Sequence, residues 1–278
     1  MSGMQGGDPI QRWFVDLSTA KGTAARAPSP QTATQQARFE WSLEVLHYFL
    51  GSDWLIREID DKGRDGYLLL DGAAGADTAY MATERTARAY YLAQDLLAVQ
   101  RIDNFSDLLT ELWSRQLRDA AAEVRALAQL VKTGSDVVFH PSNESTAKSH
   151  DASFVLDGHR VAVEVKAKAD ETPSRNAANS VADSLKKARR QLPAKGPSMV
   201  FLQLPSSWAG DEEVLYGVRS SIQRSLHRTR RLNAVVLMLD RRMPLLGGGL
   251  RSTRATITVV NPTAHTPMRT WPSQRPAQ

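Results

Sequence analysis

The chain of 278 residues contains no cysteine, and this absence removes several classes of protein at once. Without cysteine there is no disulfide framework, no cysteine-ligated zinc or iron–sulfur cluster and no thiol nucleophile, and the composition suits a reducing cytoplasm. Long apolar runs are also missing: the longest, such as residues 234–239, fall far short of the ~18 needed to span a bilayer. The opening MSGMQGGDPIQRWF has no basic segment followed by an apolar run, so no secretory signal is expected. We therefore predict a cytoplasmic protein with no membrane partner.

What is present is typical of a protein with a buried core, with 42% hydrophobic and 23% charged residues. The two ends of the chain differ from this average. Residues 1–35 are rich in Gly, Pro, Ser, Thr, Ala and Gln and are predicted to form a mobile arm. Residues 261–278 carry four prolines and no apolar period, which predicts a disordered tail.

The net charge of +5 conceals an asymmetry along the chain. Residues 1–158 hold 15 Lys or Arg against 22 Asp or Glu, a net charge of −7. Residues 159–278 hold 20 against 8, a net charge of +12. Such polarity favours a basic face directed at a polyanion, most commonly a nucleic acid, although a solvated basic surface would give the same count.

The apolar spacing predicts a mainly helical region with one hairpin over residues 36–105. Helices are expected over residues 34–50, 80–101 and 106–131, the last ending before Gly134. A hairpin is expected over residues 54–70, where the polar stretch 61–66 separates two apolar runs. The join to the following domain is expected near residues 102–106.

Beyond Gly134 the pattern changes to short strands alternating with helices, which predicts an α/β layered core. Strands are expected over residues 136–140, 152–156, 161–165, 199–204, 234–239 and 255–260, and helices over residues 177–192 and 212–230.

The chemistry is concentrated in residues 149–168, SHDASFVLDGHRVAVEVKAK. Side chains alternate along a strand, so Glu164 and Lys166 share one face. If residues 152–156 and 161–165 pair through a tight turn at residues 157–158, Asp151 lies beside them. Two carboxylates and one ammonium would then meet at one edge of the sheet, where an accidental cluster of charges is costly.

This group of side chains suits hydrolysis of a phosphodiester. Two carboxylates bind a hard cation such as Mg²⁺ through oxygen, while water and a substrate phosphate complete its coordination. The cation lowers the pKa of a bound water and neutralises charge on the phosphate. Lys166 can orient that water or stabilise the developing negative charge. The alternative is an ordinary cross-strand charge cluster on a surface hairpin.

On these residues the chain resembles the PD-(D/E)XK nuclease superfamily. The match consists of Asp151, twelve intervening residues and then Glu164-Val165-Lys166, although His150 replaces the proline of the motif. The resemblance implies an α/β fold for residues 106–260: a restriction-endonuclease-like mixed sheet flanked by helices, preceded by the mainly helical N-terminal region. It also implies an endonuclease that depends on Mg²⁺ (or Mn²⁺).

The resemblance implies two further site residues. Family members often add a glutamate from the helix before the hairpin, and Glu123 fits that place as a third metal ligand, with Glu111 and Glu144 as competitors. In some members a Lys or Gln on the helix after the motif adjoins the active site, and Gln191 or Lys187 fits this role.

The basic residues after the motif are candidates for nucleic-acid binding. Arg224, Arg228 and Arg231 are spaced to form one stripe along a helix, which could neutralise backbone phosphates without reading sequence. The candidates on the preceding helix are Lys186, Lys187 and Arg190, for which a solvated face is the alternative.

Two classes of function follow. The first is a metal-dependent nuclease acting on DNA, in restriction, antiviral (phage) defence or repair, with RNA cleavage as a variant. The second is a non-catalytic module that binds nucleic acid or protein on the same fold. In the first case the N-terminal helical region would dock a partner protein, form a homodimer or recognise substrate.

Overall fold

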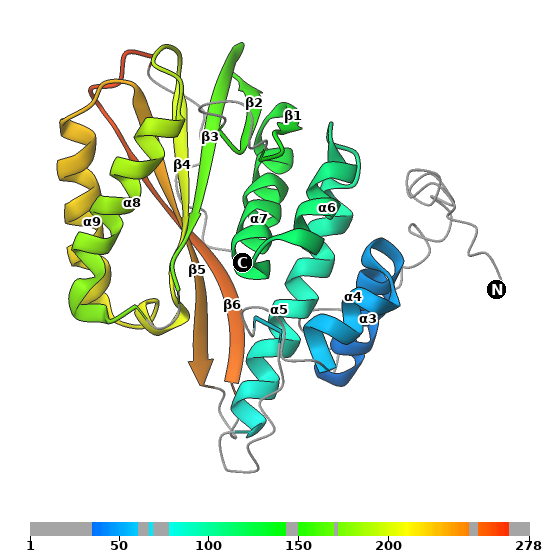
Figure 1. The fold of residues 1–278 in the computed structure, drawn as a ribbon. Helices are drawn as coiled ribbons and strands as arrows, with labels where there is room; N and C mark the ends of the chain where they lie inside the picture. The colour runs from blue at the N-terminus through cyan, green and yellow to red at the C-terminus, as the bar shows by residue number, and fades with distance from the viewer. Residues whose placement is uncertain are drawn as a thin grey trace. The chain divides into compact units, whose positions relative to one another are not determined.

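The computed structural model describes residues 35–60, 67–68, 78–142, 150–169, 172–244 and 250–266. These residues belong to two compact units, coloured by residue number in Figure 1. Unit 1 comprises Met1–Gln100 and Phe105–Leu117, and unit 2 comprises Arg101–Asn104 and Arg118–Gln278. The predicted arm up to residue 34, the turn at 61–66 and the tail from 267 lie outside the described residues.

Unit 1 is helical where the structure describes it. Its elements are α3 (Gln35–Leu50), α4 (Ser52–Leu55), the π-helical turn η1 (Ile56–Asp60), α5 (Thr78–Val99) and α6 (Phe105–Ser114). The predictions for α3 and α5 are confirmed, but the extended strand expected from Trp54 is wrong. Trp54 and Glu58 are the buried residues of that segment, which is the spacing of one helical turn and not an alternation. The Trp54 indole N–H donates to the Leu112 carbonyl oxygen at 3.1 Å.

The single helix expected over residues 106–131 is two helices. α6 ends at Ser114, and α7 (Leu117–Thr133) begins after a break at Arg115 and Gln116. No glycine or proline marks this break, which coincides with the passage from one compact unit to the other. α7 then ends immediately before Gly134, as predicted.

Unit 2 is built on a six-stranded mixed sheet in the order β1-β2-β3-β4-β5-β6. The strands are β1 (Ser135–Phe139), β2 (Ala152–Leu156), β3 (His159–Ala167), β4 (Ser198–Gln203), β5 (Leu232–Pro244) and β6 (Leu250–Val260). β3, β4 and β5 are parallel, and the remaining neighbours are antiparallel. Every strand predicted beyond Gly134 is present, and the α/β class is confirmed.

Helices cover both faces of this sheet (Figure 1). α8 (Ala177–Gln191) and α9 (Glu212–His227) connect successive parallel strands and lie side by side on one face, while α7 lies on the other. Val181, Leu185 and Ile222 of these two helices belong to the same buried hydrophobic cluster as Val200 and Leu202 of β4. Burial of such aliphatic side chains is worth roughly 1.5–3 kcal/mol each, so this layer fixes α8 beside β3.

The hairpin that carries the motif forms as predicted. Asp157 and Gly158 both have positive φ angles, 52° and 77°, and Leu156 pairs directly with His159. A two-residue turn with both central residues at positive φ matches the twist of the flanking strands, and Asp-Gly is a preferred sequence for it. This turn sets the register in which β2 and β3 pair.

Residues 261–266, predicted from composition to belong to a disordered tail, are part of unit 2. Asn261 is buried, and its side-chain amide donates to the carbonyl oxygens of Leu226, Thr229 and Leu232 at 3.3, 2.7 and 2.8 Å. Its Oδ1 accepts from the N–H of Thr263 at 3.0 Å. One side chain thus joins the end of β6 to the segment between α9 and β5.

In the part of the chain that the structure describes, no helix combines the length and the apolar character that a membrane crossing requires.

Candidate active site

The hairpin brings Asp151 to Glu164 and Lys166. Ala152 pairs with Val163, so Asp151, one residue earlier, stands opposite Glu164. The N–H of Val165, on the next position of β3, donates to Asp151 Oδ2 at 2.6 Å. This bond fixes the carboxylate of Asp151 against the backbone of the E-X-K segment.

Glu164 is fully buried, and its charge is met by a neighbouring cation. The Lys166 ammonium donates to Glu164 Oε1, and its own side chain is 25% exposed while that of Glu164 is 0% exposed. A carboxylate in such surroundings is stable only when it is paired and hydrogen-bonded. The predicted shared face of Glu164 and Lys166 is confirmed by this contact.

Two histidines lie beside the acidic pair. The rings of His140 and His150 pack edge to face with centroids 4.8 Å apart. The backbone N–H of His140 donates to the Asp151 carbonyl oxygen at 2.9 Å. Burial lowers the pKa of both imidazoles, reinforced by Arg160 at His140 and by His140 at His150. Both imidazoles therefore bind a proton less readily than a free histidine does.

A hydroxyl and a guanidinium complete this side of the site. Ser153 is buried, and its Oγ lies 3.0 Å from Nε2 of His140. The Arg160 guanidinium donates to the same oxygen at 3.1 Å. Ser153 and Arg160 were not predicted as site residues, although both fall at alternate positions of the two motif strands and so on the face of Asp151 and Glu164.

A second lysine follows Lys166 at the same alternation. Lys168 Nζ donates to the Ser180 carbonyl oxygen in the second turn of α8 at 2.6 Å. Burial lowers the pKa of Lys168, Lys187 lowers it further, and Asp183 opposes them. Lys168 ties β3 to α8, and the VEVKAK spacing is the signal that could have pointed to it.

Glu123 lies on α7 and is buried, with 3% of its surface exposed. Among the described residues there is no group of three or more His, Asp or Glu side chains placed to hold a metal ion. The structure therefore does not gather Glu123 with Asp151 and Glu164 into a three-ligand set, and the role of Glu123 stays a prediction. Of its competitors, Glu111 is in unit 1 and pairs with Arg115, while Glu144 lies outside the described residues.

α7 is buried around its circumference over much of its length. Residues 120–128 are all buried, so Glu123 and Arg125 are enclosed together with their apolar neighbours. Val131, near the end of the helix, is 37% exposed. A helix buried around its circumference cannot be oriented from apolar spacing alone.

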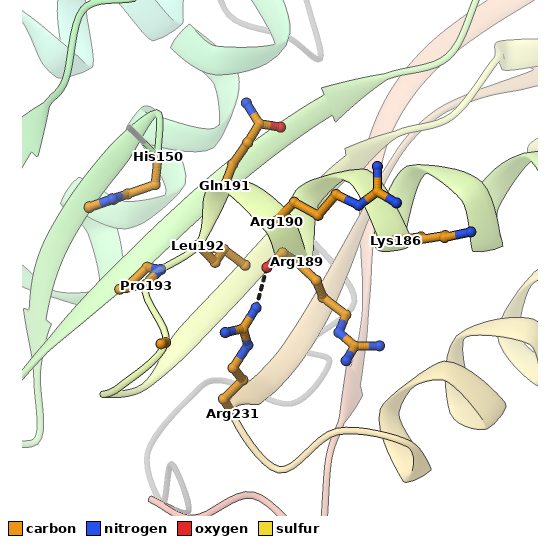
Figure 2. Close-up of a pocket in the computed structure, with 9 residues that line it drawn as sticks. His150, Lys186, Arg189, Arg190, Gln191, Leu192, Pro193 and Arg231 are labelled. Carbon is orange, nitrogen blue, oxygen red and sulfur yellow. Dashed lines mark hydrogen bonds between the residues drawn. The ribbon is translucent and has the colours of Figure 1, made fainter. Parts of the chain in front are cut away.

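A pocket of about 930 Å³ surrounds the C-terminal end of α8 (Figure 2). It brings together four predicted site or binding residues with His150 and Arg189, which were not assigned a binding role. Its polar and charged lining residues are His150, Lys186, Arg189, Arg190, Gln191 and Arg231, and none is acidic. His150 places the pocket next to Asp151 in the chain.

The cations of the pocket do not converge on one point. In Figure 2, Lys186 and Arg190 extend from α8 away from His150, whereas the Arg231 guanidinium reaches the Arg189 carbonyl oxygen and donates to it. Arginines in the last turn of a helix also complement its dipole, which is their ordinary structural role. A divergent arrangement suits a row of phosphates better than a single small anion.

The predicted arginine stripe is not a feature of one helix. α9 ends at His227, Arg228 is its C-cap, and Arg231 lies beyond the helix and lines the pocket. The N–H groups of Arg228 and Thr229 bond to carbonyls only three residues back, and this tightening ends the helix. Arg224 and Arg228 are exposed outside the pocket, as is Lys187 on α8.

Comparison of the chain with protein-family models, with curated proteins and with solved structures gives no match.

Proposed function

We propose that this protein is a metal-dependent nuclease of the PD-(D/E)XK type that hydrolyses phosphodiester bonds. The observation that carries the proposal is the placement of Asp151 opposite Glu164, with the Lys166 ammonium bonded to Glu164. The order helix, three strands, helix, strand from α7 to β4 supports it, because the family's common core has the same order. The fold would then be restriction-endonuclease-like.

The donor set fits a hard divalent cation. Asp151 and Glu164 offer carboxylate oxygens from adjacent strands, which are the ligands that Mg²⁺ and Mn²⁺ favour. These two residues would hold the ion, with Glu123 as a proposed third ligand. Such an ion supplies charge neutralisation at the phosphate and an activated water.

The remaining work falls to side chains that the fold holds in place. The Val165 N–H fixes Asp151, and burial fixes Glu164, so neither carboxylate must be ordered when substrate binds. The quarter-exposed Lys166 can orient a water or stabilise negative charge on the phosphate. Gln191 would take a positioning role from the pocket side.

The substrate class follows from charge. The pocket beside His150 is lined by four cations and no acid, which suits a polyanion. We propose that Lys186, Lys187, Arg190 and Arg231, with Arg224 and Arg228 as exposed flanking cations, contact nucleic-acid phosphates. DNA is the proposed substrate and RNA the variant; restriction, antiviral defence or repair in the cytoplasm is the proposed setting. The helical unit 1 would dock a partner or a second copy.

The test is incubation with plasmid, linear duplex, single-stranded DNA and RNA, with Mg²⁺ or Mn²⁺ and with EDTA. Asp151→Asn and Glu164→Gln should abolish metal-dependent cleavage, because each removes a carboxylate while keeping its shape. Glu213→Gln, an exposed glutamate on α9, is the matched control and should cleave like wild type. Full cleavage by Asp151→Asn would refute the site.

The second candidate is a non-catalytic module that binds nucleic acid or protein. The breadth of the basic pocket favours it, since such a surface binds a polyanion whether or not a bond is cut. Metal-independent binding of all four nucleic acids without cleavage of any would select this candidate.

A further inference from the structure

The β5–β6 hairpin extends beyond the rest of the sheet as a two-stranded ribbon. The last residue of β5 with a partner on β4 is Met238, whereas pairing with β6 continues from Leu239–Ala255 to Pro244–Leu250. At about 3.4 Å per residue, these six pairs span about 17 Å. Nothing in the catalytic proposal uses this ribbon.

A buried arginine anchors the base of the ribbon. Arg125 of α7, 3% exposed, donates to the carbonyl oxygens of Leu239 on β5 and Ala255 on β6 at 3.0 and 3.4 Å. It also donates to Asp240 Oδ1 at 2.9 Å and to Gln203 Oε1 at 2.7 Å. These bonds hold both strands at the point where the ribbon leaves the sheet, so its direction is set by unit 2.

The ribbon is strongly basic. Residues 239–255 contain Asp240 as their only acid against Arg241, Arg242, Arg251 and Arg254. The charge of Asp240 is met by Arg125 at 2.9 Å and by Arg254 Nε at 3.9 Å. Arg241 is exposed. The two strands of the ribbon therefore carry an excess of positive charge that its own acid does not neutralise.

The ribbon leaves the sheet at the end where the candidate active site lies. Lys166 pairs with Leu202 and Leu202 with Leu237, so the level of Lys166 is two residues before the base of the ribbon. Across the sheet, β3 and β5 are separated by two strand spacings, or about 10 Å. A long anion held by the ribbon would thus pass close to Lys166.

We propose that the ribbon from residue 239 to 244 and from 250 to 255 is a docking element for double-stranded nucleic acid. A two-stranded β-ribbon fits the major groove of B-DNA, which is about 12 Å wide, and arginines are suited to phosphates and base edges along it. The inference rests on the proposed nucleic-acid substrate, but it concerns binding and requires no cleavage.

The test measures binding of the full chain to a labelled 25-base-pair duplex and to a single strand of equal length. Binding is measured by fluorescence anisotropy in EDTA across a series of salt concentrations. Arg241→Ala/Arg251→Ala removes one cation from each strand of the ribbon. If each neutralises one phosphate, the slope of log K against log salt should fall by about 1.8 and duplex affinity by about 60-fold at 0.1 M salt. The loss should be smaller on the single strand, which has no groove.

Two further variants separate charge from folding. Arg241→Lys/Arg251→Lys keeps the charge and should retain most of the salt slope. Arg219→Ala, an exposed arginine on α9, should leave duplex binding unchanged.

An unchanged duplex affinity in the double alanine variant, with a folded protein, would overturn the ribbon proposal. Equal losses on duplex and single strand would overturn its preference for a duplex. Neither outcome affects the proposed nuclease, which is tested by cleavage and not by binding. Conversely, if wild type binds the duplex through the ribbon but cleaves no nucleic acid, the nuclease proposal fails and the ribbon proposal stands.

Discussion

Replacing Lys166 by methionine should destabilise the metal-free protein, because it leaves the buried Glu164 without its ammonium partner. Breaking a fully buried ion pair by removing one member costs about 3–5 kcal/mol. Glu164 is completely buried, but a quarter of the Lys166 side chain is exposed, and solvent screening lowers the cost. We expect a loss of about 3 kcal/mol in the free energy of unfolding.

The partner substitution should behave differently. Glu164→Gln removes the buried charge and leaves an ammonium that can reach water, so its cost should be about 1 kcal/mol. The double variant Lys166→Met/Glu164→Gln should then lie close to Glu164→Gln alone. The resulting coupling energy, about 3 kcal/mol in magnitude, is the quantity that a double-mutant cycle reports.

Urea denaturation in EDTA and then in excess Mg²⁺ measures both effects. A divalent cation beside Glu164 replaces the missing ammonium, so Mg²⁺ should stabilise Lys166→Met more than wild type. Saturation at a hundred times the Kd is worth about 2.7 kcal/mol. Lys187→Met, an exposed lysine on α8, is the matched control and should change stability by less than about 0.5 kcal/mol.

Two results would refute this reasoning at different points. Wild-type stability of Lys166→Met in EDTA would show that Glu164 is not held as a buried carboxylate by Lys166. If Lys166→Met is destabilised as expected in EDTA but Mg²⁺ stabilises neither this variant nor wild type, the buried ion pair is supported and the metal site is refuted.

Two further predictions concern stability and are read from denaturation curves. Gly134→Ala should lower the free energy of unfolding by about 1–3 kcal/mol, because its Cβ would lie 2.5 Å from Phe154 Cδ2 and 2.9 Å from the Val155 carbonyl oxygen. The control Gly217→Ala, with open space around its Cβ, should raise it by about 0.5–1 kcal/mol. Equal effects of the two substitutions would contradict the close packing at Gly134. In EDTA, the free energy of unfolding should fall as the pH drops through 6.5. The reason is that His140 and His150 have lower pKa values in the folded protein than in the unfolded chain, which therefore binds the protons first. The slope is at most about 1.4 kcal/mol per pH unit for each histidine, and the double variant His140→Gln/His150→Gln should flatten it.

The β2–β3 hairpin and the contact between Glu164 and Lys166 could be predicted from the sequence because they depend on local rules. The Asp157–Gly158 turn fixes the register of β2 and β3, and strand alternation then places Glu164 and Lys166 on one face. Both signals lie within eighteen residues of one another and need no knowledge of distant contacts.

The segments that were predicted wrongly depend on partners far away in the chain. Trp54 reads equally well as part of a strand or of a helix, and its bond to Leu112, 58 residues later, belongs to a helical environment that local spacing does not reveal. The break between α6 and α7 and the burial of Arg125 likewise carry no signal in the local sequence. Arg125 finds acceptors on three strands between 78 and 130 residues away.

The bonds of Asn261 have a consequence for the order in which unit 2 is completed. Its amide joins residues 226, 229 and 232, and Asn261 follows the last residue of β6 in the chain. During synthesis, which proceeds from the N-terminus, helices α8 and α9 and all six strands of the sheet emerge before Asn261 is available. Until residue 261 leaves the ribosome, the carbonyl oxygens of Leu226, Thr229 and Leu232 therefore lack the amide that joins them to the end of β6.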